Sequence, residues 1–147
     1  MVNHQLQITL IQLLKDGHQV EVPAFGMSMF PLLLPGDNLL VQPSIPKVGD
    51  IGVFVCNQLL IAHRLYKIED NYYYFKGDGL IFPDRPISVD HVLGTVTGRK
   101  RRNKTTICES GVFRLFRKFM PELTFLTGHL FFYSGRIYSK ILEQTNH

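Results

Sequence analysis

Short runs of β-branched and aromatic residues, separated by turn sequences, fill the first two thirds of this 147-residue chain. Such residues favour strands, whereas Gly, Asp, Asn and Pro favour turns. Strands joined by short turns pair antiparallel. The pattern predicts a compact antiparallel β domain over residues 18–105, built from "HQVEVPAF", "DNLLVQP", "DIGVFVC", "LLIAHRLYKIE", "NYYYFKG" and "HVLGTVTGRK".

Helical patterns stand at both ends of the β domain. Leucines at helical spacing before Asp16 and Gly17 predict a short N-terminal helix within residues 1–17. "GVFRLFRKFM" at 111–120 predicts a basic amphipathic helix that ends at Pro121, and a shorter one is expected at 136–143. The fold class is therefore mainly β, with a basic helical tail over 106–147 that either packs on the β domain or lies on a membrane.

Charge is divided unequally along the chain. Residues 1–98 carry 6 Lys and Arg against 9 Asp and Glu, whereas residues 99–147 carry 10 against 3. A basic tail indicates an anionic partner, either membrane headgroups or nucleic acid. The basic run at 99–104 lacks an aromatic-interleaved RNA motif, so nucleic acid is not the expected partner.

Targeting and metal-binding patterns are missing from the sequence. The first 14 residues have no basic n-region, and the apolar stretch at 119–133 is too short and too polar to span a bilayer. We therefore expect a cytoplasmic or peripherally membrane-associated protein. Cys56 and Cys108 form no Cys-x-x-Cys motif and the six histidines are scattered, which predicts reduced thiols, no metal site and no cofactor.

A serine stands in an apolar turn at the centre of "AFGMSMFPLLLPGD", residues 24–37. A hydroxyl becomes a useful nucleophile only beside a base, and Ser28 has two candidates in the β domain, His63 and Lys76. His63 lies in a strand-like run, where a histidine can also be purely structural. Gly26 permits a turn in which the backbone N–H of Ser28 stabilises a developing oxyanion.

Several sequence blocks, in this order, resemble the clan of type I signal peptidases and LexA-type self-cleaving regulators. They are Gly-Met-Ser-Met-Phe-Pro at 26–31, Pro-Gly-Asp at 35–37, Gly-Asp-Ile at 49–51, His-Arg at 63–64, Lys-Gly-Asp at 76–78 followed by Asp84, and Gly-x-Val at 94–96. The match covers residues 20–98. Bacterial members usually have lysine before the arginine, so His63 resembles the Ser-His branch found in the endoplasmic reticulum and in short bacterial relatives.

The resemblance implies a coiled antiparallel β domain of the LexA and signal peptidase type, and a serine endopeptidase. It would cleave an extended signal or leader peptide after a small residue through an acyl-enzyme. Ser28 would be the nucleophile and His63 the base, with Asp84 as the orienting carboxylate and Asp78 as the alternative. Substrate would contact Phe25, Gly26, Met27 and Met29. The other hypothesis is a non-catalytic adaptor that keeps the fold and binds peptides or membranes.

Two properties of the residues bear on these roles. A lysine must lose about three pKa units before it accepts a proton at neutral pH, whereas a histidine titrates near 6.5. His63 therefore needs an orienting carboxylate rather than a dry pocket. Asp78 lies in Gly77-Asp78-Gly79, where a carboxylate can also serve only to cap a turn.

Overall fold

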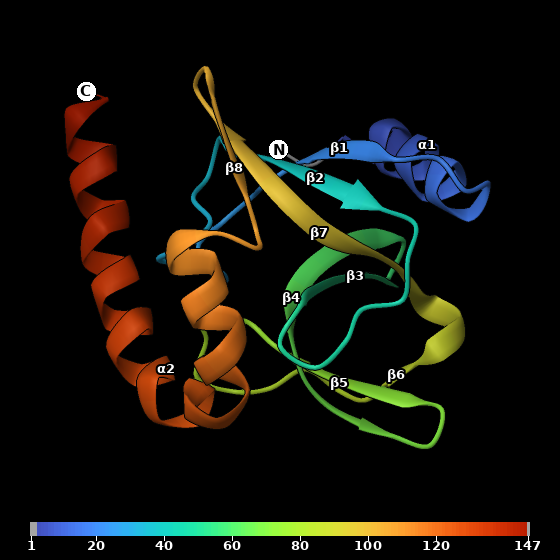
Figure 1. The fold of residues 1–147 in the computed structure, drawn as a ribbon. Coiled ribbons are helices and arrows are strands. Elements are labelled where there is room, and N and C mark those ends of the chain that lie inside the picture. Colours follow the sequence, from blue (N-terminus) through green and yellow to red (C-terminus); the bar gives the residue numbers. More distant parts are fainter. Residues whose placement is uncertain (1–2, 147) are drawn as a thin grey trace.

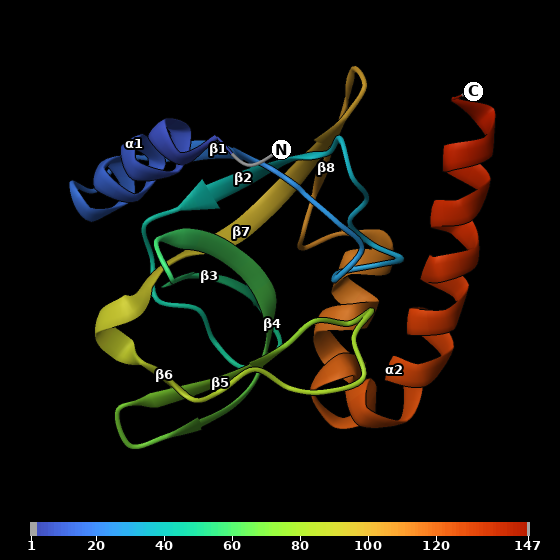
Figure 2. The same cartoon turned by 180° about the vertical axis from the view of Figure 1, so that it is seen from behind.

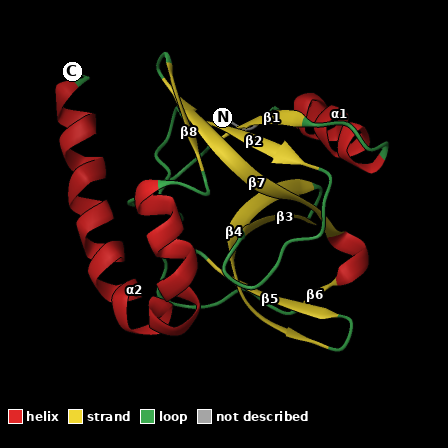
Figure 3. Ribbon diagram, viewed as in Figure 1, coloured by secondary structure: helices red, strands yellow, loops and turns green. Residues whose placement is uncertain are grey.

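The fold is a strongly curled antiparallel sheet with one helix at each end of the chain (Figures 1 and 3). The computed structural model describes residues 3–146. Its elements are α1 (His4–Lys15), β1 (Val20–Pro23), β2 (Asn38–Gln42), β3 (Ile51–Cys56), β4 (Leu59–Glu69), β5 (Tyr72–Lys76), β6 (Ile87–Ser88), a 3-10 turn (Val89–His91), β7 (Val92–Arg101), β8 (Lys104–Ile107) and α2 (Gly111–Thr145). This architecture confirms the predicted mainly β class.

The strand order in the sheet is β1-β2-β7-β3-β4-β5-β6, and β8 pairs with β7. Each predicted run contains one strand, but the sequence did not predict β6 or β8. Strand β8 extends the sheet to Ile107, two residues beyond the predicted boundary at 105. It was missed because the hairpin around Arg102 is polar and mostly exposed, so it lacks the apolar alternation that marks a half-buried strand.

The main core lies inside the curl of the sheet. Apolar side chains of β1, β2, β3 and β7 meet Leu10 and Leu14 of α1 there. A second cluster joins the aromatic rings of Phe54, Tyr73 and Phe75. Cys56 and Cys108 are free, which confirms the predicted thiols. The core therefore fixes β3 and β4 between α1 on one side and α2 on the other (Figures 1 and 2).

The predicted end of a helix at Pro121 is wrong. Residues 111–145 form one α-helix that continues through this proline. Pro121 has no N–H for the Arg117 carbonyl, and that carbonyl lies against Gly49, where a Cβ atom would approach it to 2.5 Å. Because Gly49 has no side chain, the carbonyl fits closely against the β domain and the helix is not interrupted.

Helix α2 is sharply bent, so that two arms run side by side (Figures 1 and 2). The rings of Phe116 and Phe131 stack with centroids 5.9 Å apart. Fifteen residues of straight helix would separate them by about 22 Å. The two helices predicted at 111–120 and 136–143 are therefore the two arms of one helix, and the chain reverses between Phe116 and Phe131.

The inner side of α2 packs on the β domain through an ion pair and contacts between aromatic rings. Arg117 Nε lies 2.9 Å from an Asp50 carboxylate oxygen, and the ring of Phe125 meets that of Tyr66 edge-on. Tyr138 in the second arm contacts the ring of Phe30. Across the described residues, neither helix has an apolar stretch of the length needed to cross a bilayer.

Asp37 ties the turn before β2 to the end of β7. Its buried carboxylate accepts hydrogen bonds from Leu34 N and from Arg101 Nε and Nη2, all at 2.8 Å. Burial raises the pKa of this carboxyl, but the hydrogen bonds from Arg101 and Leu34 outweigh burial and hold the pKa below its ordinary value. The ionised carboxylate therefore stabilises the folded state.

Replacing Asp37 with Asn is expected to lower the free energy of unfolding by about 2 to 3 kcal/mol at pH 7, because charge-assisted hydrogen bonds are lost in a buried site. The contribution of a carboxylate with a lowered pKa is complete above its unfolded value of about 4 and is lost as pH falls through the folded pKa. Urea unfolding at pH 7 and pH 3 should therefore show a smaller difference between the two proteins at pH 3. Asp90→Asn, at an exposed carboxylate, is the control.

Candidate active site

The loop that carries Ser28 is docked onto the segment that follows β5. The Ser28 carbonyl accepts a hydrogen bond from Gly79 N at 2.9 Å. Added Cβ atoms at Gly77 and Gly79 would come within 2.4 Å of the Ser28 carbonyl oxygen and 2.6 Å of the Met27 carbonyl oxygen. Both glycines are needed for this close approach. Gly26 has φ +69°, the left-handed conformation that the sequence led us to expect at the start of the turn.

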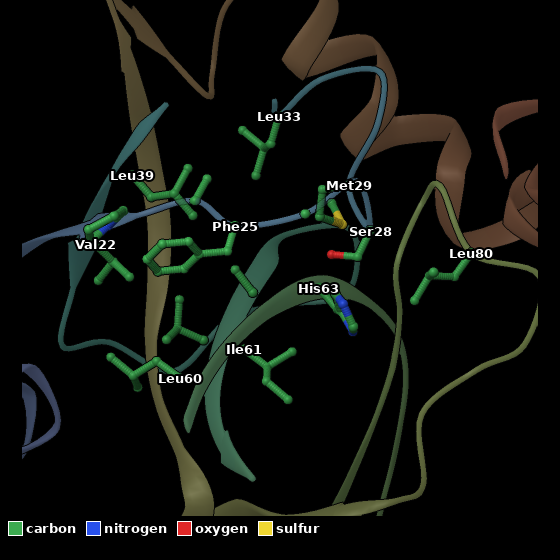
Figure 4. A pocket seen from close by; sticks show the side chains of 15 residues that line it. Val22, Phe25, Ser28, Met29, Leu33, Leu39, Leu60, Ile61, His63 and Leu80 are labelled. Carbon is green, nitrogen blue, oxygen red and sulfur yellow. The ribbon is translucent and has the colours of Figure 1, made fainter. Parts of the chain in front are cut away.

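A cavity of about 290 Å³ opens beside Ser28. Figure 4 shows the Ser28 side chain next to the His63 ring at one part of its wall. The remaining lining is almost entirely apolar, and its side chains come from β1, β2, β3, β4 and the loops around Ser28 and Leu80. They include Val22, Phe25, Met29, Leu39, Leu60 and Ile61.

His63 lies on β4 with its ring buried against the cavity. Its Nδ1 atom is 2.5 Å from Oδ2 of Asp84. The ring of Phe54 meets the imidazole at 68°, with centroids 6.1 Å apart. An ionised carboxylate only accepts hydrogen bonds, so Nδ1 carries the proton and Nε2 is the basic nitrogen.

Asp84 reaches His63 because the loop after β5 returns to that strand. Asp84 N donates to the Phe75 carbonyl at 2.9 Å. Phe75 in turn pairs with Leu65, two residues after His63 on the neighbouring strand. The carboxylate is only partly exposed, at 24% of its side-chain surface. The backbone of β5 therefore sets the position of the acid relative to the histidine.

Asp78, the alternative partner for His63, is used elsewhere. Successive residues of a strand face opposite sides, so Arg64 points away from the cavity. Its guanidinium holds Asp78 through Nε at 3.2 Å and Nη2 at 2.5 Å, and Nη1 donates to the Gly49 carbonyl. Both side chains are almost fully buried. Of the two carboxylates, Asp84 contacts the histidine and Asp78 anchors the start of the loop.

Lys76, the other candidate base, is also directed away from the serine. Its Nζ atom donates to the Thr124 carbonyl at 3.0 Å, to Thr124 Oγ1 at 2.9 Å and to the Gly77 carbonyl at 3.1 Å. Burial lowers the pKa of the Lys76 ammonium below its usual value, although the carboxylates of Asp78 and Asp84 act in the opposite direction. Lys76 therefore links β5 to the bend of α2.

The predicted substrate contacts agree with the cavity in three positions and differ in one. Phe25, Gly26 and Met29 line it. Met27 does not, because its side chain lies toward α2, where its Cε atom is 3.6 Å from the position of a Cβ on Gly135. Three lining residues were not predicted from the sequence, although they directly precede His63 on the same strand: Leu60, Ile61 and Ala62.

Two backbone N–H groups in the Ser28 turn are available as hydrogen-bond donors. Within residues 3–146, the backbone N–H groups of Met27 and Ser28 donate no hydrogen bond, and Ser28 Oγ takes part in none. Catalytic hydrogen bonds are often long before substrate binds. The turn thus presents a hydroxyl and two free N–H groups beside a cavity that also holds an oriented histidine.

A comparison with models of protein families and with curated proteins finds no match for this chain.

Proposed function

We propose that this protein is a serine endopeptidase of the Ser-His branch of the signal peptidase clan, with Ser28 as nucleophile, His63 as general base and Asp84 as the residue that orients His63. The observation that carries the proposal is the 2.5 Å contact between Asp84 Oδ2 and His63 Nδ1 on the wall of the cavity that Ser28 also lines. A buried histidine held in this tautomer by a carboxylate is the arrangement that a hydroxyl nucleophile requires.

The proposed reaction proceeds through an acyl-enzyme. Nε2 of His63 takes the Ser28 proton as Oγ attacks the peptide carbonyl, and the N–H groups of Ser28 and Met27 are the candidate donors to the oxyanion. The imidazolium gives the proton to the leaving amine as the C–N bond breaks. Water, deprotonated by His63, then attacks the ester. The bond between the acyl carbon and Ser28 Oγ breaks, the peptide leaves with its new carboxyl group, and His63 returns the proton to Oγ. Asp84 remains ionised and stabilises the imidazolium in both steps.

The cavity and the adjoining strand edge favour an extended substrate. Leu60 N donates to the Gln7 side chain of α1 and not to β3, so Leu60 forms a non-hydrogen-bonded pair with its β3 partner. Such pairs recur every second residue of an antiparallel ladder, so the backbone N–H and C=O of Ala62 also point away from β3. Pairing with β5 begins only at Arg64. A peptide strand added at Ala62 would place alternate side chains toward an apolar cavity of about 290 Å³, which suits small apolar residues before the scissile bond.

A fluorophosphonate probe tests the proposal without a known substrate. We expect the probe to modify the wild-type protein once, at Ser28, as seen by intact mass and peptide mapping, because only an activated serine reacts readily. Ser28→Ala should not react. Ser44→Ala, at an exposed serine outside the cavity, is the matched control and should react like the wild type. Failure of the wild type to react, together with no cleavage of a peptide library, would favour the non-catalytic adaptor.

A further inference from the structure

The surface of α2 that faces away from the β domain is lined with apolar side chains. They recur every three or four residues along both arms, so they form one stripe on the helix. We call it the outer apolar face; it consists of Val112, Leu115, Phe119, Leu123, Leu126, Leu130, Tyr133, Ile137 and Ile141. All nine are exposed, and Leu126 and Leu130 reach 76% and 63%.

The bend brings the two halves of this stripe onto one surface. The buried positions of α2 are Phe113, Met120 and Thr124 in the first part of the helix and Gly128 and Gly135 in the second, all on the side toward the β domain. The arms lie side by side, with Phe116 and Phe131 between them (Figures 1 and 2). The stripe of each arm therefore points away from the domain. Exposed apolar surface of this extent marks an interaction site.

Basic side chains border the outer apolar face. Arg114 and Lys118 each precede a residue of the stripe on the first arm, and Arg136 and Lys140 do so on the second. All four are exposed. Residues 111–145 carry five Lys and Arg and two Asp and Glu, a net charge of +3. Glu122, which is also exposed, precedes Leu123 on the same border, so the border carries both signs with a net positive charge. An apolar face with a border of net positive charge is complementary to a bilayer whose lipid headgroups are negatively charged.

We propose that the bent helix α2 docks the protein on the surface of an anionic membrane. Apolar side chains of the outer face would enter the boundary between headgroups and acyl chains, and the four basic side chains would contact the headgroups. A second copy of this chain fits the face less well, because stacking two such faces would bring basic edges of equal charge together. The proposal does not depend on catalysis.

Docking through this face would also set the distance of the candidate active site from the membrane surface. The opposite side of α2 contacts the Ser28 loop, where Gly135 lies against the Phe30 ring and the Tyr138 ring contacts it at a tilt of 39°. Lys76 holds the Thr124 carbonyl from the same side. The loop would therefore stand about one helix diameter, roughly 10 Å, above the headgroups. An extended peptide emerging from the membrane could enter the cavity at that height.

Vesicle flotation tests the proposal. We expect the full chain to float with vesicles of phosphatidylcholine containing 30% phosphatidylglycerol, and to do so at least tenfold less with pure phosphatidylcholine or in 0.5 M NaCl. The double variant Leu126→Ser, Leu130→Ser should lose at least tenfold in binding. Ile45→Ser with Ile68→Ser, at exposed apolar positions of the β domain, is the matched control and should bind like the wild type.

Two further measurements make the outcome decisive. Ser28→Ala should bind vesicles normally, which separates this proposal from the proposed peptidase activity. Lys118→Glu with Lys140→Glu should weaken binding while circular dichroism shows an unchanged helix content. Absence of binding by the folded wild type overturns the proposal. So does sedimentation showing a lipid-free dimer that Leu126→Ser with Leu130→Ser converts to a monomer, because a second copy would then cover the face.

Discussion

His63→Ala is expected to slow the modification of Ser28 by a fluorophosphonate, and any peptide cleavage, by about ten-thousandfold or more. Without the imidazole the Ser28 hydroxyl keeps its proton and is a weak nucleophile. Lys76, the other candidate base, is not placed to replace it, because Lys76 Nζ donates its hydrogen bonds to Thr124 and Gly77. The rate of adduct formation, followed by intact mass, measures the loss.

Two control variants make this result specific. His91→Ala removes an exposed histidine and should leave the rate of modification unchanged. Lys76→Met should lower the melting temperature, because a buried side chain loses its partners in α2, but it should leave the serine reactive in the folded protein. A reactive His63→Ala protein combined with an unreactive, folded Lys76→Met protein would make Lys76 the base and contradict the assignment.

The sequence predicted the β domain well because most of its strands can be recognised from the residues within and next to them. Alternating apolar residues and Gly-Asp turns define β1 to β5 and β7. The contact between His63 and Asp84 spans 21 residues. Its prediction came from the order of sequence blocks, since no local rule relates two residues that meet through the pairing of β4 with β5 and the return of a loop.

The arrangement of α2 could not be predicted because tertiary contacts override local preference there. Pro121 normally ends a helix, but Gly49 accommodates the carbonyl that it leaves without a donor. The Thr124 carbonyl accepts from Lys76, which is 48 residues away. Met27 was predicted to contact substrate, and this prediction could not foresee a tertiary contact with α2. Its side chain packs toward Gly135, and nothing near residue 27 in the sequence indicates a helix at that place.

Asp84→Asn and Asp78→Asn are expected to have opposite effects, although the two carboxylates stand only six residues apart. Asp84 is partly exposed, and among the described residues its carboxylate makes one hydrogen bond, with His63 Nδ1. An amide there can accept from Nδ1 less well or donate to it in the wrong tautomer, so the rate of serine modification should fall by about ten-thousandfold while the melting temperature changes little.

Asp78 is fully buried and is the carboxylate partner of the buried Arg64 guanidinium. Neutralising it leaves a buried charge without compensation, at a cost of about 3 to 5 kcal/mol, which lowers the melting temperature of a domain of this size by about 10 °C or more. At a temperature where Asp78→Asn is still folded, Ser28 should react within about tenfold of the wild-type rate.

The pair of variants thus separates orientation of the base from stability of the loop that carries it. If Asp84→Asn retained the wild-type rate, the histidine would not depend on this carboxylate and the proposed triad would be wrong. If Asp78→Asn melted like the wild type, the Arg64 pair would contribute nothing net to stability. In that case the close fit of Gly77 and Gly79 against the Ser28 loop would have to hold the loop by itself.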